Sequence, residues 1–158
     1  MSTSGGEKSG SRRRARRKAF EVLYGLGFEP VTGETGLRKR FDDSPQKEDS
    51  RPQGPGMAYA WDLTLGVWRH TDELDETIAK YSKNWRLSRI GRIEMTILRI
   101  AMFEILMQED IPLRVAINEA VELAKSYGDD NSPNFINGIL DALAKAVDGG
   151  GFSVKKGL

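Results

Sequence analysis

The segment Ile90–Met107, with the sequence IGRIEMTILRIAMFEILM, constrains the fold of this chain more than any other stretch. Apolar side chains recur along it at helical spacing in two stripes, which contain Ile93, Ile97, Ile100 and Met107 on one side and Leu98, Ala101 and Ile105 on the other. A helix that is apolar on most of its circumference is buried on several sides, so we expect it at the centre of a helical bundle. Its four charged residues exclude a membrane span, because a charge at the centre of a bilayer is costly.

Amphipathic segments on both sides of this central helix predict further helices, and no segment shows the alternation typical of a strand. We expect these helices over Arg12–Gly27, Met57–Thr71, Glu73–Trp85, Arg114–Tyr127 and Pro133–Val147. Each carries apolar residues three and four positions apart, which is the pattern of a helix with one buried face. The chain is therefore predicted to be all-α.

Three stretches differ in composition from the predicted helices. Residues 1–11 are rich in Gly and Ser and are expected to be disordered, and residues 149–158 are expected to form a loose tail. The stretch Phe28–Gly56 holds four of the six prolines and few apolar residues, so we interpret it as a flexible insert, although Leu37 and Phe41 would allow a helix of one or two turns. The prediction is one domain over residues 12–148 that contains this insert.

A dense cluster of positive charge lies near the N-terminus, although the formal net charge of the chain is only +1. The cluster contains Arg12, Arg13, Arg14, Arg16, Arg17 and Lys18, so the rest of the chain is net negative. Five of these six residues are arginines, whose guanidinium groups suit bidentate contact with phosphate. We interpret the cluster as a localised anion-binding surface, with a merely solvated basic face as the alternative.

The residue inventory excludes several kinds of chemistry. The chain has no Cys, which excludes disulfides, thiolate catalysis and Cys-based zinc sites. Its single His70 leaves almost nothing for a His-based metal site or a Ser-His relay, so we expect no metal and no cofactor. The first 30 residues contain no apolar signal segment, so a cytoplasmic location without membrane contact is expected.

Five motifs follow one another along the chain: RRRAR, NWRLSRI, ILRIAMFEI, DIPLRVAINEAVELAKSYG and NFINGILDAL. In this order they resemble the NusB transcription antitermination family. The resemblance is close over Arg12–Leu26 and Leu74–Leu143 and weak over Phe28–Gly56, where the family usually has a short helix and loops. It implies an all-α protein of about seven helices in two packed bundles, without enzymatic activity.

The resemblance also implies a function and a set of contacts. Family members bind the boxA element of nascent ribosomal RNA together with NusE, a protein of the small ribosomal subunit, within an antitermination complex of RNA polymerase. The six cations would contact phosphate, Tyr24 and Phe135 would contact bases, and Asn131 and Asn134 would bond to base edges. Glu94 matches a family position near the NusE-binding surface. From the residues alone, these side chains could equally serve packing, turns or a solvated face.

Arg99, within the apolar central helix, calls for a partner. A lone buried Arg would be costly, and Asn118 and Glu119 lie on an otherwise apolar stripe of a neighbouring helix. We therefore predict that Arg99 pairs with Glu119 or Glu122 and that this polar pair fixes the register of the helices.

Two other functions fit the same pattern. The chain could be a module for ribosome assembly that binds NusE without RNA. It could also resemble the helical domain that occurs in front of an RNA cytosine methyltransferase, but that enzyme needs a nucleophilic Cys, which this chain lacks, so it could only be a fragment of one. The sequence decides neither between a monomer and a homodimer nor whether residues 28–56 contact RNA.

Overall fold

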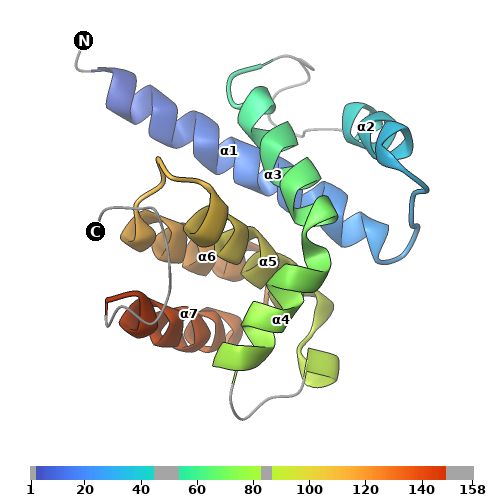
Figure 1. Cartoon of the computed structure of the whole chain (residues 1–158). Coiled ribbons are helices and arrows are strands. Elements are labelled where there is room, and N and C mark those ends of the chain that lie inside the picture. Colours follow the sequence, from blue (N-terminus) through green and yellow to red (C-terminus); the bar gives the residue numbers. More distant parts are fainter. Residues whose placement is uncertain (1–2, 45–53, 83–86, 149–158) are drawn as a thin grey trace. The chain divides into compact units, whose positions relative to one another are not determined.

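The computed structural model describes residues 3–44, 54–82 and 87–148, and helices dominate this part of the chain (Figure 1). Seven α-helices and one short 3₁₀ helix occur in these ranges, without a strand, so the all-α prediction is confirmed. The chain divides into two compact helical units, residues 1–69 and residues 70–158.

The first unit contains α1 (Thr3–Leu26), α2 (Glu34–Asp43) and α3 (Met57–Arg69). Both α1 and α2 pack against α3. Their shared core is built from small and large apolar side chains at helical spacing: Ala15, Val22, Leu37, Phe41, Met57 and Ala60. The core positions the basic part of α1, because Ala15 is one of its members.

Helix α1 begins at Thr3, whereas residues 1–11 were predicted to be disordered. The prediction was wrong from Thr3 onward, and the cooperativity of helix formation gives the reason. Nucleation of a helix is costly, but adding a residue to an existing helix is not. The buried face of α1, which includes Ala15, Ala19 and Val22, supplies the nucleus from which a Gly- and Ser-rich segment can continue as helix.

Helix α2 lies inside the predicted flexible insert. Leu37 and Phe41 are buried, and the ring of Phe41 packs edge-on against Trp61 of α3 with centroids 5.3 Å apart. The expectation of a flexible insert is therefore wrong for residues 34–43, and the short helix allowed by these two residues is confirmed. Residues 45–53 of the insert and the predicted tail 149–158 lie outside the described residues.

The second unit contains α4 (Thr71–Tyr81), a 3₁₀ helix (Leu87–Arg89), α5 (Arg92–Met107), α6 (Leu113–Tyr127) and α7 (Ser132–Asp148). Helix α5 contacts α4, α6 and α7, and ten of its residues are buried. The prediction of a central helix is therefore confirmed, with a start two residues later than expected.

Arg99 of α5 pairs with Asp75 of α4 rather than with α6. Its Nε lies 2.7 Å from Asp75 Oδ1 and its Nη2 lies 2.9 Å from Oδ2, which makes a bidentate ion pair. The predicted pairing with Glu119 or Glu122 is wrong, and Glu122 instead accepts a hydrogen bond from Lys125 at 3.1 Å. The need for a partner was correct, but periodicity does not tell which neighbouring helix each face of α5 meets.

Candidate nucleic-acid interface

The six cations of α1 differ in their access to solvent. Arg13 is exposed, and Arg12, Arg14 and Arg17 are half-buried. Arg16 and Lys18 are only 3% and 5% exposed. All six are predicted to contact phosphate, but Arg16 and Lys18 are buried, so only the other four cations, all arginines, are accessible to an anion.

Lys18 serves the interior of the first unit. Its Nζ donates a hydrogen bond of 2.5 Å to the carbonyl oxygen of Ser44 and lies 4.9 Å from the ring centroid of Phe41. Burial lowers the pKa of Lys18, and the negative charges of Glu21 and Asp42 partly oppose this effect. Helical spacing could have predicted this inward position, because Lys18 follows the buried Ala15 by three residues.

Tyr59 of α3 supports the first arginine of the cluster. The Cζ atom of Arg12 lies 4.7 Å from the ring centroid of Tyr59, and that of Arg16 lies 6.0 Å from it. A guanidinium over an aromatic ring is held by a cation–π interaction, which limits its rotamers. Sequence reasoning did not identify Tyr59, because nothing in its local pattern distinguishes it from an ordinary residue of an amphipathic helix.

Three aromatic rings follow the basic cluster at intervals of four residues. Phe20 and Tyr24 are stacked, with centroids 5.6 Å apart and an interplanar angle of 8°. Tyr24 and Phe28 meet edge-on at 5.2 Å and 74°. Phe20 is buried, Tyr24 is half-buried and Phe28 is 64% exposed. Tyr24 thus lies on the same helix as the arginines, as predicted, whereas Phe28 had been assigned to the insert.

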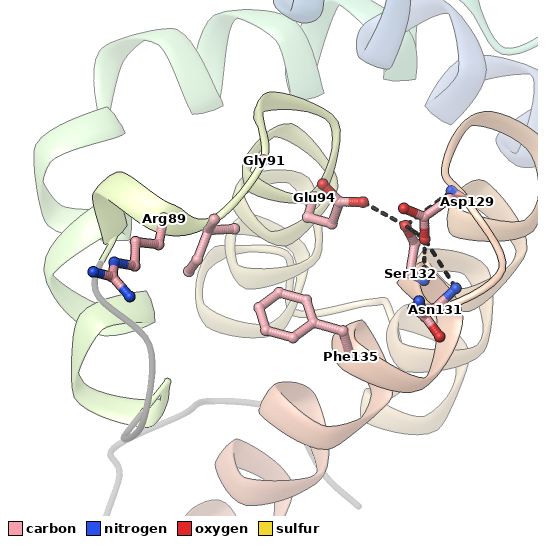
Figure 2. A pocket seen from close by; sticks show the side chains of 8 residues that line it. Arg89, Gly91, Glu94, Asp129, Asn131, Ser132 and Phe135 are labelled. Carbon is pink, nitrogen blue, oxygen red and sulfur yellow. Dashed lines mark hydrogen bonds between the residues drawn. The ribbon is translucent and has the colours of Figure 1, made fainter.

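The second unit has an open pocket of about 510 Å³ between the start of α5 and the start of α7 (Figure 2). Its lining consists of Arg89, Ile90, Gly91, Glu94, Asp129, Asn131, Ser132 and Phe135. The ring of Phe135 points into the pocket, with Arg89 across from it. The pocket therefore brings together Glu94, predicted to contact a protein partner, and Asn131 and Phe135, predicted to contact RNA. Asn134 is exposed but is not part of this lining.

Asp129 and Ser132 organise the loop at the pocket. Oδ1 of Asp129 accepts hydrogen bonds from the backbone N–H groups of Asn131 at 2.9 Å and Ser132 at 3.1 Å. In return, the Asp129 N–H donates to Ser132 Oγ at 3.1 Å, which completes a reciprocal cap of α7. The Ser132 hydroxyl donates to Oε2 of Glu94 on α5. The side chain of Glu94 is thus held in the pocket by a residue of α7. Asp129 is a candidate site residue that the sequence analysis did not identify.

Two glycines leave the space for this arrangement. A Cβ atom on Gly91 would overlap Oε1 of Glu94, the end of a flexible side chain that could move aside. A Cβ atom on Gly128 would overlap both Oγ and Cβ of Ser132 and would also crowd the carbonyl oxygen of Ala124. Any larger residue at position 128 must therefore displace the backbone at the start of α7.

Neither a metal-binding cluster nor a membrane-spanning helix occurs among the described residues. They contain no group of three or more His, Cys, Asp or Glu side chains that could hold a metal ion. None of the helices in the described ranges is long and apolar enough to cross a membrane. The basic face of α1 and the pocket of the second unit instead present guanidinium groups, aromatic rings and hydrogen-bonding groups.

Comparison with known proteins identifies the family. The model of the NusB family matches residues 13–145. A transcription antitermination protein NusB from Nitratidesulfovibrio vulgaris (strain Miyazaki F) is 48% identical over 158 residues, which cover 94% of this chain and 96% of that protein. Among solved structures, NusB of T. maritima is 34% identical with a TM-score of 0.70, over 85% of this chain and 90% of that one.

A second solved structure shows the same fold in a complex. It contains the antitermination factors NusB and NusE with double-stranded RNA, and its matching chain is 28% identical with a TM-score of 0.69. The match covers 86% of this chain and 97% of that one. The matched profile spans both helical units, from the basic cluster of α1 to the last helix. The chain therefore belongs to the NusB family.

Proposed function

We propose that this protein is an RNA-binding transcription antitermination factor. It binds boxA RNA of nascent ribosomal transcripts together with NusE and promotes read-through by RNA polymerase. The observation that carries the proposal is the placement of accessible arginines and Tyr24 on one helix, α1, in a chain whose relatives are named antitermination proteins. The solved complex of a related NusB with NusE and RNA supports both partners.

Different residues have different roles in the proposed RNA contact: arginines contact phosphates, and aromatic rings stack on bases. Arg12, Arg13, Arg14 and Arg17 neutralise phosphates, and Arg12 is held ready by its contact with Tyr59. If three or four phosphates are neutralised, the log–log dependence of affinity on salt has a slope of about −2 to −3 for single-stranded RNA. Tyr24 and Phe135 present rings to unstacked bases, which is how single-stranded RNA is usually read.

The proposed role is binding rather than catalysis. The chain has no Cys to act as the nucleophile that the methyltransferase alternative requires. Its single histidine, His70, lies 3.2 Å from Glu73 Oε1 and stacks on Phe103, with ring centroids 6.3 Å apart. These contacts give His70 a role in packing α4 against α5.

Neutralising the basic cluster tests the proposal. The triple variant Arg12→Gln, Arg13→Gln, Arg14→Gln removes three charges from α1. A matched control, Lys39→Gln, Lys125→Gln, Lys145→Gln, removes three charges from exposed lysines on α2, α6 and α7. Binding of a labelled boxA RNA and of a scrambled RNA is measured by fluorescence anisotropy at two salt concentrations, with and without purified NusE.

We expect wild type and control to prefer boxA RNA, with tighter binding when NusE is present. The arginine variant should bind at least tenfold more weakly at low salt and show a slope reduced by about 2. NusE binding should be unchanged. Equal and weak binding of both RNAs by wild type, with NusE binding intact, would contradict the proposal and favour an interaction module that binds NusE without RNA.

A further inference from the structure

The exposed ring of Phe28 extends the RNA surface beyond Tyr24. We propose that Phe28 is a stacking platform for one nucleobase of the bound single-stranded RNA. The inference rests on the proposed function, and it assigns an RNA contact to the start of the segment between α1 and α2, where the family resemblance in sequence is weak.

Exposure distinguishes Phe28 from the other aromatic side chains of the first unit. It is one of two large hydrophobic residues that are exposed among the described residues, the other being Val115 on α6. Its neighbours in the series, Phe20 and Tyr24, become steadily more buried towards the core. A large apolar ring at 64% exposure contributes little to the stability of the fold. Its position is better suited to contact with a ring of a bound molecule.

The backbone at Phe28 is held in place. The N–H of Phe28 donates to the carbonyl oxygen of Gly25 at 3.1 Å, and the N–H of Glu29 donates to the same oxygen at 3.0 Å. From α2, Nη1 of Arg40 donates to the carbonyl oxygen of Glu29 at 2.9 Å. The turn after α1 is thus tied to both helices, and a preorganised ring loses less conformational freedom when a base binds.

The geometry of the two outer rings favours RNA. Tyr24 and Phe28 lie 5.2 Å apart but at 74° to each other, so they cannot share one base. Each can receive a base of its own when the strand is splayed, as single-stranded RNA is when its bases are read individually. Stacking tolerates any base, because every base has a π-face. The accessible arginines earlier on α1 would meet phosphates of the same strand.

Three substitutions of Phe28 separate stacking from other effects. Phe28→Ala removes the ring, Phe28→Leu keeps an apolar side chain without a π-face, and Phe28→Trp enlarges the π-face. Val115→Ala is the matched control, because it shortens the other exposed large hydrophobic residue. The RNA is a fluorescein-labelled single-stranded boxA oligonucleotide, and its affinity for the full chain is measured at two salt concentrations with circular dichroism as the check on folding.

Phe28→Ala and Phe28→Leu should each weaken RNA binding by about tenfold, within the range known for loss of one aromatic–base stack. Phe28→Trp should bind at least as tightly as wild type. The dependence of RNA affinity on salt should stay unchanged in the Phe28 variants because no charge is lost. Their affinity for NusE should equal that of wild type. The Val115→Ala control should bind RNA as tightly as wild type. On addition of RNA, the extra tryptophan of Phe28→Trp should show quenched fluorescence relative to wild type.

Full RNA affinity of Phe28→Ala and Phe28→Leu would overturn the inference while leaving the proposed function intact. A loss of NusE affinity with RNA affinity preserved would overturn it as well and would assign Phe28 to a protein interface. If the wild-type chain itself fails to prefer boxA RNA, the proposed function fails, and this outcome is visible before any Phe28 variant is measured.

Discussion

Lys18 carries the same charge as the arginines that precede it, yet its surroundings assign it a different role. Its ammonium group lies in the core region of the first unit, bonded to the carbonyl oxygen of Ser44. Burial lowers the pKa of Lys18 from its ordinary value of 10.5. The unfolded chain therefore binds more protons than the folded protein between the two pKa values, and stability rises with pH through that window.

Replacing Lys18 tests this consequence. The variant Lys18→Met keeps an unbranched side chain that is one heavy atom shorter, and it removes the titrating group. Relative to the variant, wild type should gain free energy of unfolding as the pH rises towards 10.5, the ordinary pKa of lysine, as measured by urea unfolding at each pH. Lys39→Met, at an exposed position on α2, is the control and should follow the wild-type profile. Parallel profiles for wild type and Lys18→Met would contradict the assignment.

The sequence can nominate residues by their own chemistry, but it cannot nominate residues whose role depends on a neighbour in the folded chain. The RNA contacts of the arginines, Tyr24, Asn131 and Phe135 are expected from their residue types and from the family resemblance, and they stay predictions. Tyr59 and Asp129 were missed, because a cation–π contact between helices and a cap bonded to another helix exist only once the chain has folded.

At the scale of the element, a hydrogen bond from one hydroxyl group links α7 to α5 in addition to the packing of the two helices. Ser132 Oγ donates to Glu94 and accepts from the N–H of Asp129, so its removal leaves a carboxylate and a backbone donor without this partner. Ser132→Ala should lower the free energy of unfolding by about 1–3 kcal/mol, as expected for the loss of a cap whose hydroxyl is buried and also bonds a half-buried carboxylate.

Urea unfolding measures the effect of Ser132→Ala. The control Ser126→Ala, at an exposed position on α6, should change stability by less than about 0.5 kcal/mol. Ser132→Thr keeps the hydroxyl and should recover part of the loss. A midpoint of Ser132→Ala equal to that of wild type would mean that the hydrogen bond to Glu94 contributes nothing to stability.

Helix α2 shows where composition misleads. The prolines and charges of the insert predict a linker, and two apolar side chains four residues apart were enough to build a docked helix. Phe41 packs on Trp61, and the guanidinium of Arg38 lies 4.8 Å from the Trp61 ring centroid. Average composition over 29 residues hides such a local signal, since the helix occupies only ten of them.

At the scale of the whole molecule, α5 organises the second unit because it touches each of the other three α-helices there. Leu98 is fully buried in this contact, whereas Leu106 on the same helix is half-buried. Leu98→Ala should cost about 2–5 kcal/mol of stability through lost burial and a residual cavity. Leu106→Ala should cost clearly less, and thermal unfolding followed by circular dichroism compares the two. Equal losses would contradict the central position of Leu98.

Any side chain at Gly128 would overlap Ser132, so the loop between α6 and α7 is closely packed at its first residue. Two residues separate Asp129 from Ser132, and this spacing closes the reciprocal cap while Ser132 also reaches Glu94. One inserted residue would break either the cap or the bond to Glu94. Insertions and deletions should therefore be tolerated poorly in this loop, and a natural or designed variant that lengthens it must rebuild the pocket around Phe135 as well.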